Sequence, residues 1–117
     1  MTLPFGAIAT AAGGAYSGKP RPVLIAQNPR CRTGESVIVM PFTSVANPLV
    51  DTRVEVQPSA ANGLDRPCFL EVDKLSAIRA DWLGAPIGRL EDGPLAEALK
   101  LARELLSPPL QTPPASP

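Results

Sequence analysis

The chain has 117 residues with 11 basic and 11 acidic side chains, so its formal net charge is zero. This length predicts one domain, and a hydrophobic fraction of 44% is that of a folded chain rather than a disordered one. The absence of histidine excludes a Ser-His-Asp triad, a Cys-His pair and a histidine metal site. No apolar run reaches the roughly 18 residues that a bilayer-spanning helix needs, so we expect a cytoplasmic protein without membrane association, whose two cysteines are reduced.

The first half of the chain is expected to form three strands separated by turn-rich loops. Residues 6–11 form a short strand, and the glycine-rich residues 12–20 form the loop that follows. Residues 21–27 are typical of a buried strand whose prolines stand at its start, where a missing N–H is tolerated. Residues 36–42 are the most β-prone run in the chain, because branched apolar side chains dominate it.

The second half continues with further short strands. Residues 53–57 alternate apolar and polar side chains, which predicts a strand with one buried face. Residues 68–79 are expected to hold one or two strands, and residues 85–90 another. Short strands at this spacing predict a small barrel or sandwich.

The C-terminal part changes period. From Leu95 onward, apolar side chains recur at helical spacing as far as Pro108, which predicts an amphipathic helix capped by Asp92 or Gly93. Residues 107–117 contain five of the 15 prolines and are expected to form a disordered tail. The predicted fold class is therefore mainly β with a C-terminal helix.

Two polar residues far apart in sequence are brought together if the second and third strands form an antiparallel hairpin. With Gln27 opposite Val37, Arg21 lies opposite Thr43, so both stand at the same end of the sheet. Ser44 lies beside this pair and Lys19 just outside it.

A guanidinium fork beside hydroxyl groups is suited to binding a phosphate, so the hairpin predicts an anion site. An alternative remains open at this point. Arg21 could instead pair with a carboxylate such as Asp73, and Thr43 could cap a turn.

Several segments together resemble the MazF/PemK family of toxin endoribonucleases, within the CcdB/MazF superfamily. The most specific pair is Gly18-Lys19-Pro20-Arg21-Pro22-Val23-Leu24-Ile25 with Met40-Pro41-Phe42-Thr43-Ser44. Further matching segments follow in the same order, namely Gly6-Ala7-Ile8, residues 56–63, Val72-Asp73-Lys74 and Ile87-Gly88-Arg89-Leu90. The resemblance assigns residues 1–106 to a toxin domain.

The resemblance implies a small SH3-like β-barrel of the CcdB/PemK-like fold that works as a homodimer. It also implies a type II toxin that cleaves single-stranded RNA at short motifs without metal or cofactor, and that a cognate antitoxin neutralises. Arg21 and Thr43 match the family's active-site pair. The implied reaction is attack of a ribose 2′-hydroxyl on the adjacent phosphate, with Arg21 stabilising the phosphorane and Thr43 binding a phosphate oxygen.

Six further residues are expected to bind substrate: Tyr16, Ser17, Lys19, Ser44, Asp73 and Lys74. Tyr16 is the stacking candidate, whereas Asp73 and Lys74 could equally form an exposed ion pair. Ala7 stands where the family usually has an aspartate, which puts part of the polar network around the site in doubt.

Two other functions remain possible on these grounds. A non-catalytic SH3-like module could bind RNA or peptide without turnover, and the Ala7 departure keeps this alternative open. A CcdB-like poison of DNA gyrase typically ends in Trp-Gly-Ile, whereas this chain ends in Ala115-Ser116-Pro117.

Overall fold

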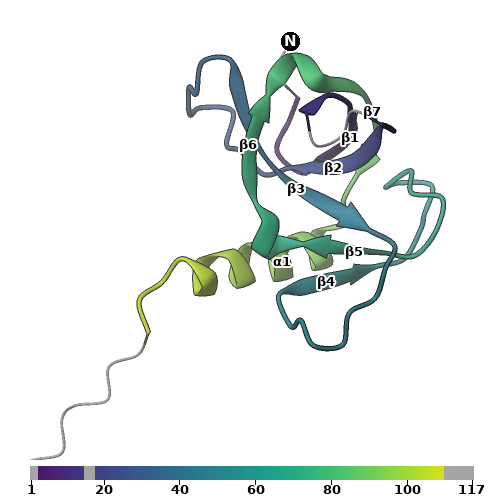
Figure 1. The fold of residues 1–117 in the computed structure, drawn as a ribbon, viewed down its shortest axis with the longest axis vertical. Helices are drawn as coiled ribbons and strands as arrows, with labels where there is room; N and C mark the ends of the chain where they lie inside the picture. The colour runs from purple at the N-terminus through teal and green to yellow at the C-terminus, as the bar shows by residue number, and fades with distance from the viewer. Residues whose placement is uncertain (1–2, 15–17, 110–117) are drawn as a thin grey trace, which may run out of the picture.

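The structure is a computed structural model that describes residues 3–14 and 18–109. These residues form strands, two short 3₁₀ helices (η) and one α-helix (Figure 1), with the following bounds: β1 (Ala7–Ala11), β2 (Arg21–Ile25), β3 (Ser36–Thr43), β4 (Arg53–Val56), β5 (Cys68–Glu71), η2 (Val72–Lys74), β6 (Ser76–Arg79), η3 (Ala80–Trp82), β7 (Leu83–Arg89) and α1 (Asp92–Leu105). The predicted strands are confirmed, and residues 68–79 contain two of them. Neither α1 nor the 3₁₀ helices are long and apolar enough to cross a membrane in this part of the chain.

Strand β3 connects the two parts of the sheet. Its first half pairs with β6, its middle with β2, and its last two residues with β5. The strand order is β4-β5-β3-β2-β1-β7, with β6 paired to β3 beside this path. Figure 1 shows β3 running from the curled upper part of the sheet to β4 and β5 beside α1. No described pairing joins β4 to β7, so the mainly β class with one C-terminal helix is confirmed, but backbone hydrogen bonds do not close the barrel.

At β2, both faces of the sheet carry buried apolar side chains, and successive side chains of a strand point to opposite faces. Leu24 of β2 lies in a core beneath α1, whereas its neighbours Val23 and Ile25 lie in a second core within the curled part. Helix α1 buries Leu95 and Ala98 against the first core. The buried run predicted for β2 is thus confirmed, and it positions Arg21 at the strand's exposed beginning.

Gly13 and Gly14, at the start of the loop between β1 and β2, pack directly on Trp82. A Cβ added at Gly14, whose φ is +52°, would overlap the ring of Trp82. The Ala12 N–H also donates to the Trp82 carbonyl at 2.9 Å. These contacts hold the start of the loop between β1 and β2 against η3.

A buried asparagine joins the loop before β5 to the start of α1. Asn62 is fully buried; its Oδ1 accepts from Ser59 N and Leu64 N, and its Nδ2 donates to the Gln57 carbonyl and to Glu91 Oε1. The Ser59 hydroxyl donates to the other Glu91 oxygen at 2.7 Å. These hydrogen bonds from Ser59 and Asn62 lower the pKa of the Glu91 carboxyl.

The same contacts explain where the helix begins. Glu91, rather than Asp92 or Gly93, is the N-cap residue, so the predicted cap position was wrong. The Glu91 side chain makes no capping hydrogen bond, because its oxygens accept from Ser59 and Asn62 instead.

Candidate functional site

The register of the β2–β3 hairpin agrees with the prediction. Val23 pairs with Pro41, Leu24 with Met40 and Ile25 with Val39. Continuing this ladder by two positions places Arg21 opposite Thr43. Both side chains border one cleft, so the hairpin brings together the two residues that the sequence singled out.

Three segments of the chain form this cleft, which has a volume of about 220 Å³. One is the entry to β2, the second is the end of β3, and the third is the loop that leads into β5. The lining residues are Lys19, Pro20, Arg21, Pro22, Phe42, Thr43, Ser44, Leu64, Asp65, Arg66 and Cys68.

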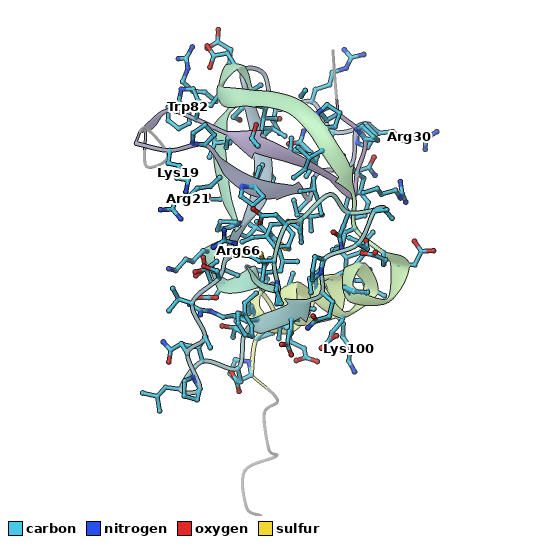
Figure 2. All side chains as sticks on the ribbon, turned by 90° about the vertical axis from the view of Figure 1, so that its right-hand side faces the viewer. Lys19, Arg21, Arg30, Arg66, Trp82 and Lys100 are labelled. Atoms are coloured by element: carbon cyan, nitrogen blue, oxygen red, sulfur yellow. The ribbon has the colours of Figure 1, made fainter. Side chains whose placement is uncertain are left out.

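The cleft carries an excess of positive charge. Its lining includes the cations Lys19, Arg21 and Arg66, against the single carboxylate of Asp65. The three cationic side chains lie along one side of the molecule, and Arg30 lies on the other (Figure 2). Such a cluster attracts anions, and a guanidinium offers a planar fork of donors that matches phosphate geometry.

Arg21 is free to engage a ligand. Its side chain is exposed, and no ion pair joins it to a carboxylate of residues 3–14 or 18–109, Asp73 included. The alternative in which Arg21 pairs with Asp73 is therefore not what the structure shows. Arg66 Nε lies 3.4 Å from Asp65 Oδ1, but both of these side chains are more than half exposed and the pair is weak.

The Thr43 hydroxyl takes part in a turn and still keeps a donor. Its Oγ1 accepts a hydrogen bond from Val45 N at 3.2 Å. Because a hydroxyl that accepts retains its own hydrogen, Thr43 can also donate to an oxygen in the cleft. The turn role and the phosphate-binding role are therefore compatible.

The other predicted site residues fall into three groups. Lys19 and Ser44 line the cleft. Asp73 and Lys74 lie in η2 and do not line it, and Lys74 Nζ is 3.0 Å from Glu71 Oε2. Tyr16 and Ser17 lie outside the described residues. The substrate-binding roles of these six residues stay predictions.

Sequence reasoning missed Arg66 and Asp65, which form the third wall of the cleft. They belong to a turn-rich loop, and the pairing of Thr43 with Phe69 brings this loop to the end of β3. The buried Cys68 donates to the Arg66 carbonyl, and burial followed by the nearby Asp65 charge raises the pKa of its thiol. A raised pKa disfavours the thiolate, so Cys68 is suited to packing at the cleft rather than to nucleophilic attack.

Ala7, the departure from the family pattern, lies away from the cleft. Its side chain is buried in the second apolar core, to which Val23 and Val39 also belong. An aspartate at this position would enter that core, so alanine suits this packing. The described ranges contain no cluster of three or more acidic or cysteine side chains able to hold a metal ion.

Comparisons with known proteins identify the family of this chain. The sequence model of a family described as PemK-like, MazF-like toxins of type II toxin–antitoxin systems matches residues 5–106. A curated relative from Mycolicibacterium smegmatis, named probable endoribonuclease MazF, is 41% identical over 82 residues, which are 70% of this chain and 75% of that protein.

Solved structures share the fold. The Mycobacterium tuberculosis toxin MazF-mt6 has a TM-score of 0.69 at 28% identity, covering 84% of this chain and 93% of that one. A mycobacterial endoribonuclease in complex with its cognate antitoxin has a TM-score of 0.74 at 20% identity, covering 94% of this chain and all of that one. The family match spans most of the chain and includes every segment that forms the cleft. The chain therefore belongs to the PemK-like, MazF-like toxins of type II toxin–antitoxin systems.

Proposed function

We propose that the chain is a toxin that cleaves single-stranded RNA as an endoribonuclease in the cytoplasm, acting as a homodimer. Residues 1–106 form the toxin domain, and residues 107–117 are a proline-rich tail. The observation that carries this proposal is the presence of Arg21 and Thr43 in one cationic cleft, on adjacent strands of a chain from this family. A cognate antitoxin neutralises the toxin by covering the cleft with a flexible segment.

The reaction needs a group that stabilises negative charge on phosphorus. The 2′-hydroxyl attacks the adjacent phosphate, the bond to the 5′-oxygen breaks, and the products are a 2′,3′-cyclic phosphate and a 5′-hydroxyl. A guanidinium is a poor general base, so Arg21 stabilises the phosphorane by donating hydrogen bonds to it. Thr43 and Ser44 hold a phosphate oxygen by donating hydrogen bonds.

The direct test is incubation of the chain with a labelled single-stranded transcript, followed by analysis of the new ends. Discrete fragments with 5′-hydroxyl and cyclic phosphate ends support the proposal. Binding of the transcript without cleavage favours the non-catalytic module instead. Growth arrest with intact RNA and inhibited gyrase favours the CcdB-like function.

Arg66 is expected to bind the RNA backbone beside the phosphate that reacts. Replacing Arg66 by alanine should raise KM about fivefold with little change in kcat. A plot of the logarithm of the RNA-binding constant against the logarithm of the salt concentration should become less steep, by about 0.7 for each phosphate contact that is lost from single-stranded RNA. Arg30→Ala, on the other side of the molecule (Figure 2), is the matched control and should leave both quantities unchanged. Titration of RNA binding against salt concentration measures the slope, and equal slopes for the two variants would contradict the role of Arg66.

Cleavage is expected to be independent of divalent metal. The chain has no histidine, and the charge stabilisation that a metal supplies in other nucleases falls to Arg21 here. The rate of cleavage in excess EDTA should match the rate in magnesium within about twofold when the ionic strength is held constant, because RNA binding itself depends strongly on salt. Loss of cleavage in EDTA that magnesium restores would refute this chemistry.

A further inference from the structure

A mostly buried arginine, Arg53, links the edge strand β4 to the turn that follows Thr43. Arg53 begins β4 and pairs directly across the sheet with Glu71 of β5. Its Nη2 donates to Glu71 Oε2 at 3.0 Å, and its Nη1 donates to the Val45 carbonyl at 3.1 Å. The Nη1 and Nη2 atoms of Arg53 therefore connect β5 to the loop between β3 and β4.

The ion pair between Arg53 and Glu71 is well shielded from water. The side chains of Arg53 and Glu71 are only 13% and 8% exposed. Lys74 adds a second cation to the same Glu71 oxygen at 3.0 Å. Arg53 Nε is buried without a hydrogen-bond partner among the described residues, so the contacts of Nη1 and Nη2 alone orient the guanidinium. Buried ion pairs of this kind fix geometry, because breaking one leaves an uncompensated charge.

Apart from a local turn, in which Asn47 accepts from Leu49 N and Val50 N, the loop that Arg53 contacts has few contacts of its own. Two of its apolar side chains, Val45 and Leu49, are 69% and 94% exposed, so apolar packing does not fix these positions. Val45 is nevertheless held twice, since its carbonyl accepts from Arg53 and its N–H donates to Thr43 Oγ1. A continuous chain of hydrogen bonds therefore runs from Glu71 through Arg53 and Val45 to the Thr43 hydroxyl.

We infer that Arg53, oriented by Glu71, is a positioning residue that fixes the direction in which the Thr43 hydroxyl donates. The Val45 N–H donates to Thr43 Oγ1, which holds the position of that oxygen and leaves its own hydrogen to donate to a ligand in the cleft. Without the Arg53 contact, the turn loosens and the hydroxyl samples other rotamers. This inference rests on the proposed RNA cleavage for its kinetic consequences, but not for its structural ones.

Arg53→Lys is the most informative substitution. Lysine keeps the positive charge beside Glu71, but its donors lie on one nitrogen and cannot reproduce the two-armed fork. Arg79→Lys is the matched control, because it removes the fork of an exposed arginine that binds Asp81 through two contacts of 3.0 and 2.7 Å. Arg79 is not among the residues that line the cleft.

The kinetic test uses a labelled transcript whose cleavage site has been mapped with the parent chain. Arg53→Lys should lower kcat about fivefold and leave KM within twofold, because the cleft cations are unchanged. Arg79→Lys should leave both constants unchanged. In a Thr43→Val background, which lacks the hydroxyl, Arg53→Lys should have almost no further effect, as expected for two residues that act through one interaction.

A structural readout works even if no RNA is cleaved. Three-bond scalar couplings of Thr43 should indicate a single χ1 rotamer in the parent chain and in Arg79→Lys, and averaged rotamers in Arg53→Lys. Failure of the parent to cleave RNA would count against the proposed function alone. Unchanged Thr43 couplings in Arg53→Lys, or an equal loss of kcat with and without the Thr43 hydroxyl, would overturn the positioning role.

Discussion

Replacing Arg21 by alanine is expected to abolish growth arrest on expression and to lower kcat/KM for RNA cleavage by about 10³, which corresponds to roughly 4 kcal/mol of transition-state stabilisation. The reason is that Arg21 is the guanidinium placed opposite Thr43, where negative charge develops on the phosphate. Arg21→Lys keeps the charge but loses the fork of donors, so an intermediate loss of about 10- to 100-fold is expected. Growth curves and single-turnover cleavage measure the two effects.

The fold of the Arg21 variants should be unchanged. Arg21 is exposed and makes no ion pair within residues 3–14 and 18–109, so its removal breaks no described contact of this kind. Thermal unfolding of Arg21→Ala should therefore coincide with that of the parent, as for most surface substitutions. Arg30→Ala, on the opposite side (Figure 2), should retain both toxicity and cleavage. An Arg21→Ala variant as toxic as the parent would remove the proposed chemistry.

Asn62→Ala is expected to destabilise the fold by about 3 kcal/mol, which lowers Tm by roughly 10–20 °C in a domain of this size. The substitution leaves the Gln57 carbonyl and the Leu64 N–H without the partners that they have now, in a fully buried site. Asn28→Ala is the matched control. It removes only an exposed hydrogen bond from Arg30 N and should cost less than about 1 kcal/mol. Denaturant unfolding at one fixed protein concentration compares the variants, because the proposed dimer would couple stability to concentration.

The hydrogen bonds among Ser59, Asn62 and Glu91 predict how the free energy of unfolding depends on pH. Hydrogen bonds from Ser59 and Asn62 lower the folded-state pKa of Glu91 below its ordinary value of 4.5. The stabilisation is therefore present above pH 4.5 and is lost as pH falls through the lower folded-state pKa. Glu91→Gln should reduce this acid dependence. In Asn62→Asp, the free energy of unfolding should instead rise as the pH falls. Protonation relieves the repulsion between the new carboxylate at position 62 and that of Glu91. Equal acid sensitivity of the parent and Glu91→Gln would contradict the assignment.

The β2–β3 hairpin shows what local pattern can predict. Its two arms are short apolar runs joined by a turn-rich loop, and side chains in a strand repeat every two residues. The observed register is the one that pairing Gln27 with Val37 predicts, and it brings Arg21 and Thr43 to one cleft. The alternation in β4 and the helical period of α1 were predictable for the same reason.

Local sequence pattern does not predict that the loop before β5 lines the cleft. Arg66 follows an Asn-Gly turn in a loop whose composition indicates only that it is a loop. Its place beside Arg21 depends on the pairing of β5 with the last two residues of β3, and nothing in either strand specifies that partner. Asn62 is similar, because the sequence marks it as a turn residue, whereas the fold buries its amide against Glu91.

The sequence by itself determined the strand and helix periods, the hairpin that joins Arg21 to Thr43, and the motifs that place the chain in its family. These features depend on residues close together in the chain, or on one hairpin register. Only the tertiary structure decided that Arg66 completes the cleft, that the side chain of the N-cap residue Glu91 accepts from Asn62, and that Arg53 connects Glu71 to the turn after Thr43. Each of these contacts joins segments whose meeting depends on strand order, and strand order is set by how the whole apolar surface is buried rather than by any local pattern.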